Sequence, residues 1–73
     1  MLDDLEFFKK ALGKRIAALR EEKDFSQAYL ASLINKDFQS LSRIENGRVN
    51  VSGYILKQIA EALETDMNNL FKF

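Results

Sequence analysis

Hydrogen-bonding side chains gather between residues 37 and 50, in the stretch DFQSLSRIENGRVN. Gln39, Ser42 and Arg43 alternate there with apolar residues at helical spacing. An amide, a hydroxyl and a guanidinium on one helical face can bind base edges or phosphates. None of them is a ready general acid or base near neutral pH. This stretch therefore favours recognition over catalysis.

The composition limits what else the chain can do. Its 73 residues include no Cys and no His, which removes the usual general base, the commonest metal ligand and any disulfide framework. A chain of this length builds one modest core, with no room for a catalytic cleft and a separate sensor domain. We therefore expect neither enzyme activity nor a metal, cofactor or small-molecule ligand.

The same composition indicates a cytoplasmic protein. A chain that is 47% hydrophobic and 30% charged is typical of a globular domain in water. No apolar run reaches the ~20 residues that span a bilayer, and the acidic residues Asp3 and Asp4 do not fit a signal peptide. The absence of Cys agrees with a reducing compartment.

The formal net charge of zero is unevenly distributed. Residues 1–8 carry −3, residues 9–50 carry nine bases and five acids for a net +4, and residues 51–73 carry −1. A basic middle segment can bind a polyanion although the total is neutral. Ordinary solvated helices of mixed charge are the alternative, and charge alone leaves both open.

Helical periodicity dominates the chain, which contains no Pro. Apolar residues at steps of three or four predict a first helix over residues 2–23. Gly13 interrupts this stripe at a cost of ~1 kcal/mol in helix propensity. We interpret it as the junction between an N-terminal helical extension, residues 1–12, and the domain proper, residues 13–73.

Four more helices are marked by residues that can cap a first turn. Ser26 and Asp37 predict helices over 27–34 and 38–46, and Ser52 and Asp66 precede a fourth helix and a short fifth. The expected fold class is all-α, with five helices.

The second and third helices are joined by about three residues, so they must cross steeply, as in a helix-turn-helix. The turn is placed at Asn35, which tolerates the left-handed conformation, and Gly47 is expected to end the third helix in the same way. A helix fits the major groove of duplex DNA, where Arg suits guanine, Gln suits adenine and an apolar group suits the thymine methyl. The outer side of the third helix supplies the candidate base-reading residues Phe38, Gln39, Ser40, Ser42 and Arg43.

Other polar residues flank this helix where the backbone of a duplex would pass. Gln27 begins the second helix, whose free amides and dipole favour an anion, and the start of the fourth helix offers a similar site. Such contacts would set register and affinity more than sequence choice. The candidate phosphate-contacting residues are Gln27, Lys36, Asn46, Arg48, Asn50 and Ser52.

The segments LREEKDFSQAYLA, SRIENGR and LKQIAEALETDMNNLF, in this order and spacing, resemble the Cro/phage-repressor-like helix-turn-helix family, also called the xenobiotic-response-element family. The resemblance covers about residues 13–71. It implies a compact five-helix, lambda-repressor-like domain that binds double-stranded DNA, usually as a dimer on a two-fold-related site. It also implies that Arg20 pairs with Glu45 and locks the first helix to the end of the third.

The chain departs from this family at several positions. Asn35 stands where Gly is usual, Lys36 where an aliphatic residue is usual, and Val51 where Pro is common. Phe38 occupies a position that is more often Gln, Arg or Ser. Its ring could read a methyl group, pack back on the domain or contact another protein.

Aromatic residues at both ends of the chain admit two interpretations. Phe7 and Phe8 lie in the N-terminal extension, and Phe71 and Phe73 close the chain. They are either additional core or a self-association surface formed with the fifth helix. We expect a homodimer, because two reading helices about one turn of DNA apart can use both halves of a symmetric site.

The sequence therefore predicts a sequence-specific, duplex-DNA-binding transcriptional regulator of bacterial or phage type, a repressor or controller that acts as a dimer. A regulatory protein partner is one route by which it could be controlled. The alternative is a protein-interaction module or antitoxin-type partner that kept the fold with little DNA binding.

Overall fold

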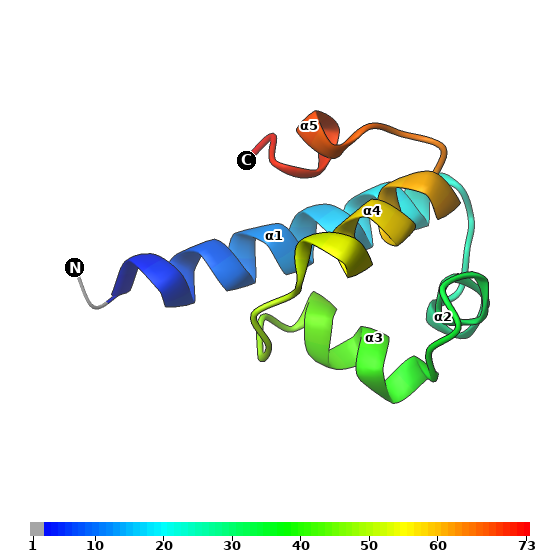
Figure 1. Ribbon diagram of the computed structural model, residues 1–73, viewed down its shortest axis with the longest axis horizontal. Coiled ribbons are helices and arrows are strands. Elements are labelled where there is room, and N and C mark those ends of the chain that lie inside the picture. Colours follow the sequence, from blue (N-terminus) through cyan, green and yellow to red (C-terminus); the bar gives the residue numbers. More distant parts are fainter. Residues whose placement is uncertain (1–2) are drawn as a thin grey trace.

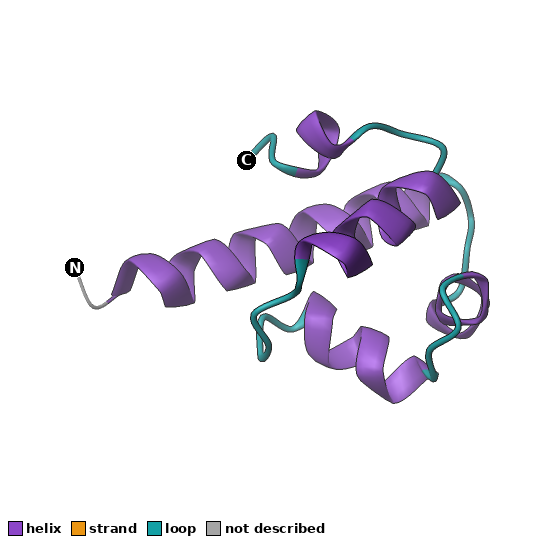
Figure 2. Cartoon of the chain, in the orientation of Figure 1, coloured by secondary structure: helices purple, strands orange, loops and turns teal. Residues whose placement is uncertain are grey.

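The computed structural model describes residues 3–73 as five α-helices and, within this range, no strand (Figures 1 and 2). Met1 and Leu2 lie outside the described part, and with them the first residue of the helix predicted over residues 2–23. The prediction of an all-α, five-helix fold is confirmed. The helices are α1 (Asp3–Glu22), α2 (Gln27–Leu33), α3 (Phe38–Glu45), α4 (Gly53–Ala62) and α5 (Met67–Leu70).

The four predicted caps start α2 to α5. In each case the capping side chain accepts a hydrogen bond from the backbone N–H three residues later, at 2.8 to 3.2 Å. This bond satisfies one of the amides that a helix start leaves unpaired. The pKa of Asp37 is lowered because the backbone N–H of Ser40 donates to its carboxylate.

The helix ends follow the predicted turn chemistry, with small differences in length. Asn35 (φ 58°) and Gly47 (φ 72°) adopt the left-handed conformation, as expected. Ile34 and Asn46 are caps, so α2 and α3 each end one residue earlier than predicted. Two further left-handed residues, at the ends of α1 and α4, were not predicted: Asp24 and Glu64.

The core lies where α1, α3 and α4 face one another beside α2 and α5 (Figure 1). Ala31 is buried, which permits the close crossing of α2 and α3. From α1, the buried apolar residues begin at Leu12, the last residue of its first half. The buried apolar residues are Leu12, Ile16, Leu19, Leu30, Ala31, Ile34, Leu41, Ile44, Leu56, Ile59, Ala60, Leu63 and Leu70.

Gly13 lies inside α1, and no break in secondary structure separates residues 12 and 13. A Cβ at position 13 would stand 2.5 Å from the carbonyl oxygen of Ile44 and closer still to that of Glu45. Gly13 is therefore where α1 makes its closest approach to the end of α3, a role that needs the missing side chain.

Polar contacts hold α5 against α1, although α5 has only one turn. Arg15 donates from Nε to the backbone oxygen of Asn69 at 2.9 Å and from Nη2 to its side-chain oxygen at 2.6 Å. The Asn69 amide in turn donates to Thr65 at 2.8 Å. Lys23 and Glu64 add an exposed ion pair at 2.9 Å between the turns that follow α1 and α4.

Candidate nucleic-acid interface

The residues predicted to read bases lie on the open side of α3. Leu41 and Ile44 anchor the opposite side in the core. Phe38 is 53% exposed, so its ring does not pack back on the domain. Gln39 and Arg43 are also exposed, whereas Ser40 and Ser42 are half-buried. The helix thus has one fixed face and one face open to a ligand.

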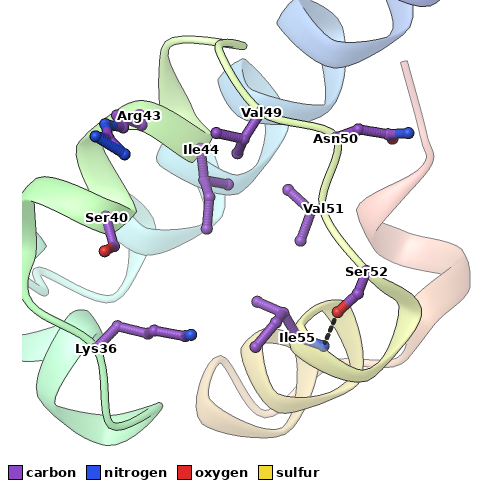
Figure 3. A pocket seen from close by; sticks show the side chains of 9 residues that line it. All are labelled: Lys36, Ser40, Arg43, Ile44, Val49, Asn50, Val51, Ser52 and Ile55. Carbon is purple, nitrogen blue, oxygen red and sulfur yellow. Dashed lines mark hydrogen bonds between the residues drawn. The ribbon is translucent and has the colours of Figure 1, made fainter.

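A hollow of about 210 Å³ lies beside this face, between α3 and the segment that leads into α4 (Figure 3). Its apolar lining comes from Ile44, Val49, Val51 and Ile55. Its remaining lining residues were all predicted from the sequence to contact bases or phosphates: Lys36, Ser40, Arg43, Asn50 and Ser52.

The hydroxyl of Ser52 has a structural task as well. It accepts a hydrogen bond from the backbone N–H of Ile55 at 3.2 Å and so caps α4 (Figure 3). A hydroxyl that accepts can still donate. Ser52 therefore remains able to donate to an anion at the rim of the hollow.

Arg20 and Glu45, the pair implied by the family resemblance, form a bidentate ion pair with two hydrogen bonds. Nε of Arg20 donates to Oε2 of Glu45 at 2.8 Å, and Nη2 donates to Oε1 at 3.0 Å. The side chains are only 11% and 5% exposed, and Nη1 of Arg20 donates to the carbonyl of Phe25 at 2.8 Å. The hydrogen bond to Glu45 raises the pKa of Arg20.

Gln27 joins this network, which sequence reasoning did not anticipate. Its amide Nε2 donates to Oε1 of Glu45 at 2.8 Å. The half-buried side chain is thus positioned by the same carboxylate that holds Arg20, at the N-terminus of α2. The second N–H of the amide can still donate to a phosphate. The predicted phosphate contact is therefore compatible with this position, although the side chain is already bound to Glu45.

The other predicted phosphate contacts lie at the two ends of α3. Asn46 caps its C-terminus, and its amide donates to the hydroxyl of Ser42 at 3.3 Å. Arg48 and Lys36 are exposed. Neither lies within 4 Å of a carboxylate among residues 4–73, so their charges are available to an anion.

The described residues offer neither a metal cluster nor a membrane span. Residues 3–73 contain no group of three or more His, Cys, Asp or Glu that could hold a metal ion. None of their helices combines the length and apolarity required to cross a bilayer.

The comparison with protein families agrees with the arrangement of α2 and α3. Residues 16–70, three quarters of the chain, match the model of the helix-turn-helix family HTH_3. The chain belongs to this helix-turn-helix family. The expectation drawn from its motifs is confirmed.

Individual relatives include two controller proteins and a gene regulator. The control protein C.MunI of Mycoplasma sp. is 39% identical over 64 residues, which cover 86% of each chain. The restriction-modification controller C.AhdI of Aeromonas hydrophila is 32% identical, with a TM-score of 0.89 over 93% of this chain and 99% of its own. The clp gene regulator ClgR of Corynebacterium glutamicum is 26% identical, with a TM-score of 0.86 over 88% of this chain and 82% of its own.

These relatives and the exposed face of α3 lead to the same conclusion. The chain is a DNA-binding transcription regulator built on the HTH_3 domain. The prediction of that function is confirmed at this level.

Proposed function

We propose that this HTH_3 protein is a controller-type regulator that binds a two-fold-related operator as a homodimer and is not an enzyme. The open face of α3 beside the hollow of Figure 3 is the observation that carries this function. The similarity to C.AhdI, which covers 99% of that controller, supports the assignment to this type. The chemistry required is recognition, and it needs no bound metal or cofactor.

The proposal divides the site residues into two groups. Phe38, Gln39, Ser40, Ser42 and Arg43 read bases, because they lie on a helix that presents one face to the major groove. The residues around its ends bind phosphates and set the register: Gln27, Lys36, Asn46, Arg48, Asn50 and Ser52.

An aromatic patch supports the dimer. Phe8 stacks on Phe71 with ring centroids 6.0 Å apart and meets Phe73 at 5.8 Å, yet the three rings stay 37%, 38% and 53% exposed. Leu5, 49% exposed, precedes Phe8 by one turn. The first turn of α1 and the chain end lie on the same side of the molecule (Figure 1). Exposed apolar patches commonly mark interaction surfaces, and a second copy is the partner we propose.

One observation favours a second function. Phe38 exposes 53% of its surface at the start of the reading helix, and Tyr29 exposes 50% on α2. An aromatic surface there also suits a protein partner, as expected of an interaction module or antitoxin-type protein. Weak binding to every duplex, together with tight binding to a protein that buries Phe38, would favour this function.

Selection of binding sites from a random duplex library tests the proposal. We expect the purified protein to enrich an inverted repeat, with an affinity that falls steeply as salt rises, since bound phosphates release counterions. Enrichment of a single half-site would keep the reading face and remove the dimer. No enrichment at low salt would contradict the DNA-binding proposal and leave the interaction module.

A further inference from the structure

A second hollow lies at the C-terminal end of α3, where the first half of α1 meets the turn after α3. It has a volume of about 780 Å³ and is lined by Glu6, Lys9 and Lys10 of α1 and by Asn46, Gly47 and Arg48 of the turn. The predicted DNA contacts include Asn46 and Arg48 but nothing from α1. The hollow therefore joins a part of the chain without an assigned DNA contact to the edge of the proposed interface.

The position of Lys10 in this hollow is fixed by Gly47. A Cβ on Gly47 would stand 2.7 Å from Cγ of Lys10 and 2.8 Å from its Cα, so the turn packs directly on α1. The turn is itself held by two backbone bonds, from Gly47 N–H to the Ile44 carbonyl at 3.1 Å and from Arg48 N–H to the Arg43 carbonyl at 2.9 Å. The backbone and Cγ of Lys10 thus lie against the turn beside Arg48, and the residue stays exposed.

The charges in the hollow are not balanced. Glu6 is paired with Lys9, whose Nζ lies 3.0 Å from its carboxylate. Lys10 and Arg48 have no carboxylate within 4 Å among residues 4–73. Lys14, one turn after Lys10 on α1, is exposed and likewise has no carboxylate in that range. Lys10, Arg48 and the Asn46 amide therefore line one hollow with no carboxylate paired to either cation, which favours an anion.

We propose that this hollow binds a backbone phosphate of the duplex that flanks the bases read by α3, with Lys10 as its main ligand. The inference rests on the proposed function and extends its footprint beyond the helix-turn-helix. A duplex seated on α3 continues past the end of the helix and carries one negative charge per ~1.7 Å of its axis. Lys10 lies at that end, in the same hollow as Asn46 and Arg48.

A purely structural role for Lys10 is the alternative. Cations beside the C-terminus of a helix offset its dipole, an effect of ~0.3–1 kcal/mol at an exposed site. Lys10→Met keeps the aliphatic stem that packs on Gly47 and removes only the charge. Lys23→Met is the matched control. It removes the same charge, but Lys23 lies outside the hollow and is paired with Glu64 near the α4–α5 turn.

The experiment measures dissociation constants, across a salt series, for two duplexes that carry the selected operator. One has an additional helical turn of flanking sequence on each side, and the other is trimmed to the bases that α3 reads. We expect trimming to weaken wild-type binding about fivefold or more. Lys10→Met should bind the long duplex more weakly than wild type does, and trimming the duplex should reduce its affinity little further. Its salt slope should be smaller than that of wild type by ~1 per half-site.

The outcomes separate this inference from the function on which it rests. If Lys10→Met matches Lys23→Met on both duplexes, or if it loses as much as wild type on trimming, the flank contact is refuted while DNA binding stands. If wild type binds neither duplex at low salt, the proposed function fails as well. A loss of melting temperature in Lys10→Met with unchanged trimming sensitivity would assign Lys10 the structural role.

Discussion

The two halves of α1 belong to one helix and continue one apolar stripe, yet their surroundings differ. In the second half, Ile16 and Leu19 are only 0% and 8% exposed and belong to the core. In the first half, Leu5 and Phe8 are 49% and 37% exposed. Figure 1 shows this half projecting beyond the rest of the domain.

The difference shows that periodicity identifies a helical face but not what covers it. The second half is buried because other helices lie opposite. Two of its polar residues also donate hydrogen bonds to them, Arg20 to Glu45 of α3 and Arg15 to Asn69 of α5. Before Leu12, the first half contacts the chain end and the turn after α3. We therefore expect changes in the second half to alter folding, and changes in the first half to alter assembly and DNA affinity.

The largest effect is expected from Arg20→Ala in the second half. This change leaves the buried carboxylate of Glu45 without its main partner, at a cost of about 3–5 kcal/mol. A domain of this size has roughly 4–11 kcal/mol of stability in total. Urea unfolding should show a large loss, whereas Lys57→Ala, which breaks the exposed pair with Glu61, should change stability by less than ~1 kcal/mol. Equal stability of the two variants would contradict this account.

Gly13→Ala should have the next largest effect. The added Cβ meets the carbonyl oxygens at the end of α3, and overpacking of this kind costs ~1–3 kcal/mol. The better helix propensity of Ala offsets at most ~1 kcal/mol of that cost. Gly53→Ala is the control, because nothing lies within 4 Å of a Cβ there. Thermal unfolding should rank Gly13→Ala below wild type and Gly53→Ala at or above it. A stabilised Gly13→Ala would disprove the close approach.

In the first half of α1, Phe8→Ala should weaken the dimer more than it weakens the fold. Its ring contacts Phe71 and Phe73 in the exposed patch. We expect the dimer dissociation constant to rise about tenfold, as measured by sedimentation equilibrium, since that corresponds to ~1.4 kcal/mol. Phe7→Ala is the control, because Phe7 lies beside Lys10, Ala11 and Lys14 and outside the patch. The proposed interface would be refuted if both variants dimerised like wild type.

The smallest effect concerns the start of α3, the helix that packs on the second half of α1. The folded state lowers the pKa of Asp37 from its ordinary value of 3.8, because Ser40 donates to the carboxylate. Its stabilising contribution is therefore present above that value and is lost as the pH falls through the lower, folded-state pKa. Asp37→Asn keeps a capping oxygen but does not titrate. As the pH is lowered below 4, the melting temperature of Asp37→Asn should fall less than that of wild type. If the melting temperatures of the two proteins fell in parallel, the Asp37 cap would not be the cause of the acid sensitivity.

Local chemistry explains what could be read from the sequence. Ser26, Asp37, Ser52 and Asp66 act on amides only three residues away, so the helix starts were predictable. The open face of α3 was predictable as well, because Leu41 and Ile44, three residues apart, mark the opposite, buried side of the same helix.

Features that depend on distant partners were not predictable. Gln27 meets Glu45 across 18 residues, and Arg15 meets Asn69 across 54. The close approach of Gly13 to the α3 carbonyls also appears only in the folded chain. The hollow around Lys10 likewise required the packing of the turn at Gly47 on α1.

The central claim is that the open face of α3 reads bases while the residues around it bind the backbone. The most direct test measures wild type, Arg43→Ala and Arg48→Ala against the selected operator and all its single-base variants. We predict that Arg43→Ala loses discrimination at one base pair per half-site, worth ~1–3 kcal/mol, and that Arg48→Ala weakens every sequence by a similar factor and lowers the salt slope. If the two variants gave the same profile, α3 would not be the reading helix and the account would be wrong.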